Sequence, residues 1–328
     1  MPCCYWDGPA IDFAEILSHR KVINISTPWA HQECQKCRRE EQYKPGYRRA
    51  GLNVIPDGIP DSKIAWLDIQ ADITCNGGCL ICGPWNSSYW QSELARYGEF
   101  QVSKTVNTLK QNVEKIFDTL DVSELKLIQF LGGEPFLSDV DKFALPYIKN
   151  PEQCEIKYTT NGSVYPQADR IQRWEDFKSV LINFSIDGIG ERFEYLRYPL
   201  KWNKVHDNVR RLIDNTGDNV RFHINHTLTP LNIFYYNEFE QWVDKTFPKN
   251  RFVGVHAHSA YGVMSVSSSG AKLREKIKQV YGAEHNLTKM LEDNPRTNNE
   301  FWKYIATWDR RRSQRWQLAF PDIAGDMT

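Results

Sequence analysis

The hydrophobic and polar positions divide the chain near residue 65. The first 65 residues follow no regular period and are rich in glycine, proline and charge, apart from an amphipathic helix predicted at 11–19. Beyond them, short β-like apolar runs alternate with longer stretches whose apolar positions have helical spacing. The short runs predict strands at 67–73, 125–131, 155–160, 180–186, 219–228 and 251–256.

The stretches between these strands predict helices at 102–120, 140–149, 167–177, 205–215 and 233–247. Six strand–helix repeats favour parallel strands joined by right-handed crossovers. The predicted fold class is therefore α/β, as a barrel or partly open barrel with its chemistry at the carboxyl ends of the strands. Further helices are predicted at 272–280, 287–291 and 301–316. The expected domains are a cysteine-rich segment (1–64), the barrel (65–260) and a C-terminal helical extension (261–328).

Composition and charge narrow the class of protein. The 41 Lys and Arg residues balance 41 Asp and Glu residues, which argues against a polycation that binds nucleic acid by bulk charge. The 41% hydrophobic and 25% charged content is typical of a globular chain. The sequence has neither an apolar run near the ~20 residues of a membrane helix nor a secretory signal. We therefore expect a cytoplasmic protein with no membrane partner, whose eight cysteines are metal ligands or catalytic groups rather than disulfides.

The strongest candidate site is the sequence Cys75-Asn-Gly-Gly-Cys79-Leu-Ile-Cys82, which follows the first predicted strand. Thiolates are the soft ligands of iron–sulfur centres, and three of them at C-x3-C-x2-C spacing can reach three irons of one cubane. The fourth iron would stay open to a small chelating ligand. Zinc is the alternative, although it usually takes four ligands from paired C-x2-C knuckles.

Small polar residues follow the next three predicted strands. The second strand is followed by Gly-Gly-Glu-Pro (132–135), whose glycines expose backbone groups and whose carboxylate can accept a hydrogen bond from an ammonium group. Thr-Asn-Gly (160–162) and Ser-Ile-Asp-Gly (185–188) follow the third and fourth strands. Each motif is also a common turn former. Together with the cysteines, however, they place functional groups at four neighbouring strand ends.

These motifs together resemble the radical S-adenosylmethionine (radical SAM) enzymes over residues 65–260. The resemblance implies a partial six-stranded parallel β/α barrel in which Cys75, Cys79 and Cys82 hold a 4Fe–4S cluster. The open iron would chelate the amino and carboxylate groups of S-adenosylmethionine (SAM). The resemblance also implies SAM contacts at Gly132, Gly133, Glu134, Pro135, Asn161, Ser185, Asp187 and Arg197. For Arg197, a surface position on a helix is the alternative. Relatives often have an aromatic residue before the third cysteine, where this chain has Ile81.

The flanking segments resemble twitch-domain radical SAM proteins, whose short cysteine modules are related to SPASM domains and can carry a second iron–sulfur cluster. The resemblance rests on residues 31–53, 82–90 and 308–321. An auxiliary cluster would use the thiols of Cys3, Cys4, Cys34 and Cys37. Relatives carry a further cysteine before the paired ones, so a zinc knuckle and no metal at all are the alternatives here. We expect the remaining Cys154 to be a buried apolar residue.

Polar residues at alternating positions of the predicted strands are candidates for substrate contact. They are Asp68, Gln70, Asp72, His223, Asn225, His256 and His258. For each histidine, a purely structural role is the favoured explanation. No serine–histidine or histidine–carboxylate pair indicates a hydrolytic site.

The resemblance implies that an electron from a donor such as flavodoxin or ferredoxin cleaves SAM into methionine and a 5′-deoxyadenosyl radical, which abstracts hydrogen from a substrate carbon. Relatives with twitch or SPASM modules often modify peptides, so a peptide is the leading substrate class, ahead of a small molecule. The basic run Arg310-Arg-Arg-Ser-Gln-Arg-Trp316 supports a second hypothesis, a nucleotide or nucleic-acid base as substrate. A solvated helix face also explains that run. A non-enzymatic iron–sulfur or zinc scaffold is the hypothesis of another class.

Overall fold

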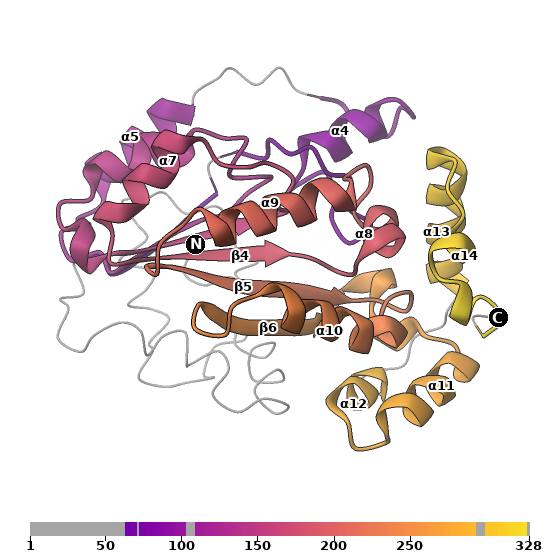
Figure 1. Cartoon of the computed structure of the whole chain (residues 1–328). Coiled ribbons are helices and arrows are strands. Elements are labelled where there is room, and N and C mark those ends of the chain that lie inside the picture. Colours follow the sequence, from indigo (N-terminus) through magenta and orange to yellow (C-terminus); the bar gives the residue numbers. More distant parts are fainter. Residues whose placement is uncertain (1–62, 71, 103–108, 293–298, 327–328) are drawn as a thin grey trace, which may run out of the picture.

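A computed structural model describes residues 63–326, apart from 71, 103–108 and 293–298 (Figure 1). The predicted helix at 11–19 and nearly all of the predicted cysteine-rich segment lie outside the described residues. The same holds for four candidate metal ligands, Cys3, Cys4, Cys34 and Cys37. The auxiliary metal site therefore stays a prediction from sequence.

Six strands form one parallel sheet in the order β1-β2-β3-β4-β5-β6. Because every neighbouring pair is parallel and consecutive in the chain, each connection must cross from one end of the sheet to the other. β1 and β6 do not pair within the described part of the chain. This arrangement confirms the predicted α/β fold and its partly open form. The strands are β1 (Trp66–Ile69), β2 (Leu127–Phe130), β3 (Glu155–Thr160), β4 (Ser179–Ser185), β5 (Val220–Leu228) and β6 (Phe252–Ser259).

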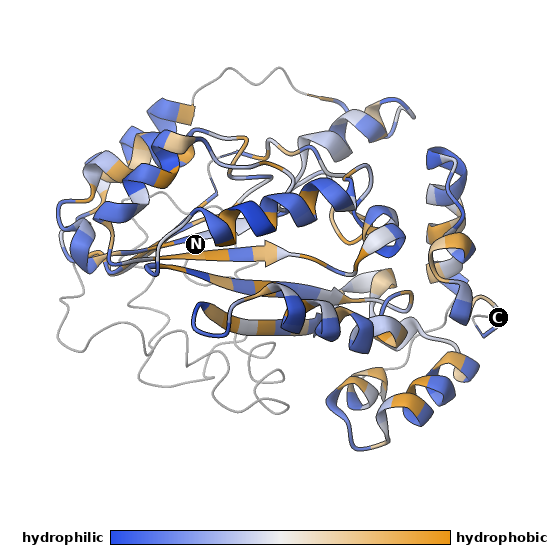
Figure 2. Cartoon of the chain, in the orientation of Figure 1, coloured by the Kyte–Doolittle hydropathy of each residue, from blue (hydrophilic) through white to orange (hydrophobic). Residues whose placement is uncertain are grey.

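Helices occupy the crossovers and cover one face of the sheet. That face is apolar: Ile156, Val180 and Phe222 are buried on neighbouring strands. Figure 2 shows that the sides of α9 and α10 turned away from the sheet are largely hydrophilic, as expected for amphipathic covering helices. The helices before β6 are α4 (Ser88–Ala95), α5 (Leu109–Thr119), α6 (Val140–Ala144), α7 (Ala168–Arg173), α8 (Gly190–Leu196), α9 (Trp202–Asp214) and α10 (Tyr236–Thr246). Of these, the sequence pattern missed α4 and α8.

The opposite face of the sheet is polar, and the described residues cover it only in part. Side chains alternate along β3 and β5 between buried and half-buried positions, because successive residues point to opposite faces. Three polar side chains on this inner face form a hydrogen-bonded row. Asn183 Nδ2 donates to Thr159 Oγ1 at 3.3 Å, and Asn183 Oδ1 lies 2.8 Å from His223 Nδ1. Of the polar residues predicted to line the barrel, His223 belongs to this row.

The C-terminal region consists of helices, as predicted, but one helix ends early. The predicted helix at 301–316 is wrong beyond Arg312, because Ser313 has a positive φ of 52° and the chain then turns. The observed helices are α11 (Ala271–Tyr281), α12 (Asn286–Glu292), α13 (Asn299–Arg312) and α14 (Trp316–Ala319). None of the helices in the described ranges is long and apolar enough to cross a membrane.

Candidate functional site

The three cysteines of the predicted cluster motif lie in the loop between β1 and α4. A Cβ atom placed on Gly77 would lie 3.3 Å from Cys79 Sγ and 3.7 Å from Cys75 Sγ. Both sulfurs therefore face the space that Gly77 leaves free of a side chain. Cys79 is buried, whereas Cys75 and Cys82 are half-buried, so part of the loop remains open to a ligand.

The loop offers three thiols, the soft donor set that iron–sulfur clusters use. Among the described residues, no three His, Cys, Asp or Glu side chains are close enough together to hold one metal ion. A cubane presents its irons at separate corners, so its thiolates are more widely spaced than the ligands of a single ion. Burial raises the pKa of the Cys79 thiol to about 12, so this sulfur must give up a proton when it binds iron.

Glycines 132 and 133 let the β2 end pack directly on the backbone that leads to the cysteines. A Cβ on Gly132 would lie 2.6 Å from the Asp72 carbonyl oxygen, and one on Gly133 would collide with the Thr74 carbonyl. Gly132 also has a φ of 129°, a backbone conformation that residues other than glycine rarely adopt. The backbone N–H of Glu134 then donates to Thr74 O at 2.7 Å. The close approach of the two backbones is thus a structural reason for the glycine pair. It adds to the predicted role, in which the glycines expose backbone groups to a ligand.

Glu134 joins the ends of β2 and β3 and has no solvent exposure. Its carboxylate accepts hydrogen bonds from Thr160 Oγ1 at 2.6 Å, from the Asn161 N–H at 2.7 Å and from the Phe136 N–H at 3.1 Å. Desolvation nevertheless dominates and raises the pKa of Glu134 to about 7. Pro135, the next residue, is buried, and its carbonyl accepts a long hydrogen bond from Arg170.

Asn161 lies between the end of β3 and the cysteine loop. Its Nδ2 donates to Asn76 Oδ1 at 3.1 Å and lies 3.9 Å from Cys75 Sγ. Asn76 in turn donates to Ser163 Oγ at 2.9 Å. Our sequence analysis did not identify Asn76 and Ser163 as site residues. The position of Asn76 inside the cysteine motif was the signal that could have identified it.

A buried ion pair connects the loop after β4 to the cysteine loop. Arg197 Nη2 lies 2.7 Å from Asp187 Oδ2, and Arg197 Nη1 donates to Cys79 Sγ at 3.8 Å. Asp187 also accepts from the Thr227 N–H at 2.7 Å. Arg197 is only 5% exposed, so the alternative of a surface arginine is wrong. Ser185 lies half-buried at the last position of β4, in register with Asn225.

Other predictions from sequence have different outcomes. Cys154 is fully buried, as predicted. Asp72 does not extend the polar row, because its carboxylate accepts from the Thr74 N–H and from Ser138 Oγ. His256 and His258 lie side by side on β6 with ring centroids 4.8 Å apart.

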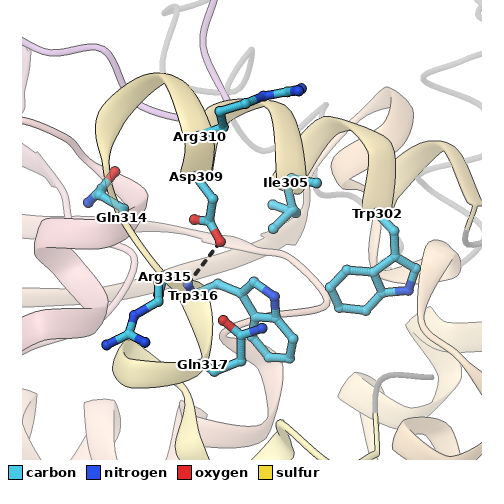
Figure 3. A pocket seen from close by; sticks show the side chains of 9 residues that line it. Trp302, Ile305, Asp309, Arg310, Gln314, Arg315, Trp316 and Gln317 are labelled. Atoms are coloured by element: carbon cyan, nitrogen blue, oxygen red, sulfur yellow. Dashed lines mark hydrogen bonds between the residues drawn. The ribbon is translucent and has the colours of Figure 1, made fainter.

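A cavity of about 620 Å³ lies between α13 and α14 (Figure 3). Trp302 and Trp316, whose ring centroids are 5.1 Å apart, line it together with Ile305. Arg310 and Arg315 are exposed at this cavity. The predicted basic run is thus divided, because its other two arginines form ion pairs: Arg311 pairs with Glu99 at the surface, and Arg312 pairs with the buried Glu93. A uniformly solvated helix face is therefore wrong.

The sequence model of the radical SAM superfamily matches residues 73–244, which is more than half of the chain. The chain therefore belongs to the radical SAM superfamily, whose enzymes use a 4Fe–4S cluster and SAM. The comparison with curated proteins gave no match.

The solved structures found by comparison are distant from this chain in sequence. The structure of polyhistidine-tagged anSMEcpe with bound AdoMet is 18% identical with a TM-score of 0.44, and the match covers 66% of this chain and 57% of that chain. Streptococcus suis SuiB bound to its precursor peptide SuiA is 12% identical with a TM-score of 0.42, covering 94% and 63%. TYW1 with a lysine-pyruvate adduct is 16% identical with a TM-score of 0.37, covering 67% and 70%. The chain thus spans less than two thirds of the length of the first two proteins.

Proposed function

We propose that this chain is a radical SAM enzyme whose Cys75, Cys79 and Cys82 hold the 4Fe–4S cluster. The observation that carries the proposal is the placement of Cys75 and Cys79. Both sulfurs face the space beside Gly77. Cys75 Sγ is contacted by Asn161, which follows β3, and Cys79 Sγ by Arg197, at the end of α8. When bound, the cluster supplies the electron that cleaves SAM into methionine and a 5′-deoxyadenosyl radical.

The residues around the cysteine loop would hold and orient SAM. We assign the methionine end to the backbone of Gly132, Gly133 and Pro135 and to the Glu134 carboxylate, and the ribose end to Asn161, Ser185 and Asp187. Arg197 supplies positive charge beside the cluster and is held in place by Asp187. Because Glu134, Asn161 and Asp187 are held by hydrogen bonds to neighbouring residues, they would position SAM at little cost in conformational entropy.

The proposed substrate is a peptide, modified at an unactivated carbon. The half-covered inner face of the sheet supports a polar substrate, since Thr159, Asn183 and His223 form a row of hydrogen-bonding groups there. The resemblance of the flanks to twitch-domain proteins supports the peptide class and a second iron–sulfur cluster on Cys3, Cys4, Cys34 and Cys37. An electron donor such as flavodoxin or ferredoxin and a cytoplasmic location complete the proposal.

The test is SAM cleavage by anaerobically reconstituted protein with a reductant. We expect 5′-deoxyadenosine to form with the wild-type chain and to disappear when Cys75, Cys79 and Cys82 are all replaced by Ala. Cys154→Ala is the matched control, because it removes a buried thiol that directly precedes β3, outside the cysteine loop. If reconstituted wild type yields no 5′-deoxyadenosine, the chain is a metal-binding scaffold rather than an enzyme.

The cavity between α13 and α14 favours a second candidate function, modification of a nucleotide or nucleic-acid base. The half-buried Trp302, backed by the buried Trp316, offers aromatic surface for a base, and the exposed Arg310 and Arg315 offer charge for phosphates. This function predicts oligonucleotide binding that weakens steeply with salt. Replacing both arginines by Ala should abolish it, whereas Lys303→Ala, at an exposed position of the same helix, should leave most of it. Absent or salt-independent binding would exclude this candidate.

A further inference from the structure

Helix α13 contacts the cysteine loop although more than 200 residues of sequence separate them. Tyr304 on α13 donates its hydroxyl hydrogen to the Leu80 carbonyl, inside the cysteine motif, at 2.8 Å. One turn further along, Trp308 packs edge-on against Trp90, with ring centroids 4.5 Å apart. Trp90 itself donates from Nε1 to the Cys79 carbonyl at 3.0 Å. The carbonyls of two successive loop residues are thus held from outside the loop.

The last residue of α13 strengthens this contact through a buried ion pair. Arg312 donates to both carboxylate oxygens of Glu93 on α4, from Nε at 3.0 Å and from Nη2 at 2.6 Å. The two residues are 7% and 5% exposed. Three rings surround the guanidinium, those of Trp90, Trp308 and Tyr198, at 5.1, 4.5 and 4.8 Å from their centroids. A bidentate pair in such a dry setting has one defined geometry, so it fixes α13 relative to α4.

The arginine also reaches the cysteine loop itself. A Cβ placed on Gly78 would lie 3.0 Å from Arg312 Nη2 and 2.8 Å from the ring of Tyr89. Any larger residue at this position would displace one of these side chains. Gly78 therefore leaves room for the contact between the loop, α4 and the end of α13.

We propose that α13 is a clamp that holds the cysteine loop in its ligand-binding shape before a cluster is present, with Glu93, Tyr304 and Arg312 as positioning residues. The role toward a cluster rests on the proposed function, but the clamp itself is a property of the metal-free chain. A loop that contains two glycines in succession loses much conformational entropy when it is ordered. Contacts that order the loop in advance reduce the entropy that cluster binding must overcome.

Hydrogen–deuterium exchange of the metal-free chain tests the clamp directly. The N–H groups of Gly78, Leu80 and Cys82 are protected by backbone hydrogen bonds to Tyr198, Leu196 and Cys79, so their exchange reports opening of the loop. Tyr304→Phe removes one hydroxyl and should speed this exchange about three- to tenfold. Glu93→Gln, which leaves the guanidinium without its charged partner, should speed it at least as much. Exchange in α9 and α10 should not change.

Tyr281→Phe is the matched control. It also removes a tyrosine hydroxyl that donates to a backbone carbonyl, but this tyrosine is on α11 and its partner is Phe234, not the cysteine loop. This control should leave the exchange of the loop unchanged. The proposal is overturned if Tyr304→Phe and Glu93→Gln fold normally and leave loop exchange at the wild-type rate. Should either variant fail to fold, the other still decides the question.

Measuring iron retention tests the clamp and the proposed function independently of each other. In the reconstituted chain, the clamp variants should lose iron to a chelator several times faster than the wild type and Tyr281→Phe. If the wild type takes up no iron at Cys75, Cys79 and Cys82, the proposed function fails while the exchange result still judges the clamp. Equal rates of iron loss in all chains would mean that α13 does not assist cluster binding.

Discussion

The Glu134 carboxyl group lies out of contact with solvent, where ionisation costs more than in water. Its pKa of about 7 in the folded chain exceeds the ~4.3 of an unfolded glutamate, so the folded state binds the proton more tightly. This group therefore stabilises the fold fully below about pH 4.5, and the contribution is lost as the pH rises to about 7. We expect the wild type to lose about 3 kcal/mol of unfolding free energy over this range relative to Glu134→Gln. Denaturant unfolding of both metal-free chains from pH 4.5 to 8 measures the difference, and parallel stability curves would contradict it.

Arg197 joins a buried carboxylate to a cysteine sulfur, so its loss should have two separable effects. Arg197→Gln leaves the Asp187 carboxylate buried without a cation, which should lower the free energy of unfolding by about 3–5 kcal/mol. Adding the second change, Asp187→Asn, should restore part of the lost free energy of unfolding. Because positive charge and hydrogen bonds near cluster sulfurs raise the reduction potential, the double variant should still have a lower potential than the wild type. A redox titration checks this, and an unchanged potential would show that Arg197 does not act on the cluster.

The loop after β2 depends on the absence of side chains at its contact with the cysteine loop. Gly133→Ala would force its Cβ against the Thr74 carbonyl, so the β2 end and the backbone before Cys75 must separate. We expect a loss of about 1–3 kcal/mol in unfolding free energy and a matching loss of iron after reconstitution. Gly83→Ala is the control, since it lies next to Cys82 and its added Cβ would meet no atom within 4 Å. Equal iron content in the two variants would contradict this account of the glycine pair.

Short apolar runs were enough to predict each strand, and the motifs at four strand ends could be read directly from the sequence, because both depend on neighbouring positions in the chain. Elements whose bounds depend on contacts between distant residues were harder to predict. The helix predicted at 301–316 breaks after Arg312, where the Trp316 N–H binds the Asp309 carboxylate instead. Short α4 and α8 carry too few apolar positions for a clear helical period. The ion pair between Glu93 and Arg312 joins residues 219 apart, a separation at which no local pattern indicates contact.

At the scale of the whole chain, seven cysteines supply thiols for up to two metal centres. The motif at Cys75, Cys79 and Cys82 can supply one cubane, and the four thiols at Cys3, Cys4, Cys34 and Cys37 are enough for another. If both form, anaerobic reconstitution should give about eight irons per wild-type chain and about four when the first three cysteines are replaced by Ala. The complementary variant, with the other four cysteines replaced, should also hold about four irons and should still cleave SAM. If the wild type instead holds about four irons and the variant without the first three cysteines holds none, the barrel cysteines account for all the iron. The chain then has a single cluster, and its N-terminal thiols bind zinc or no metal.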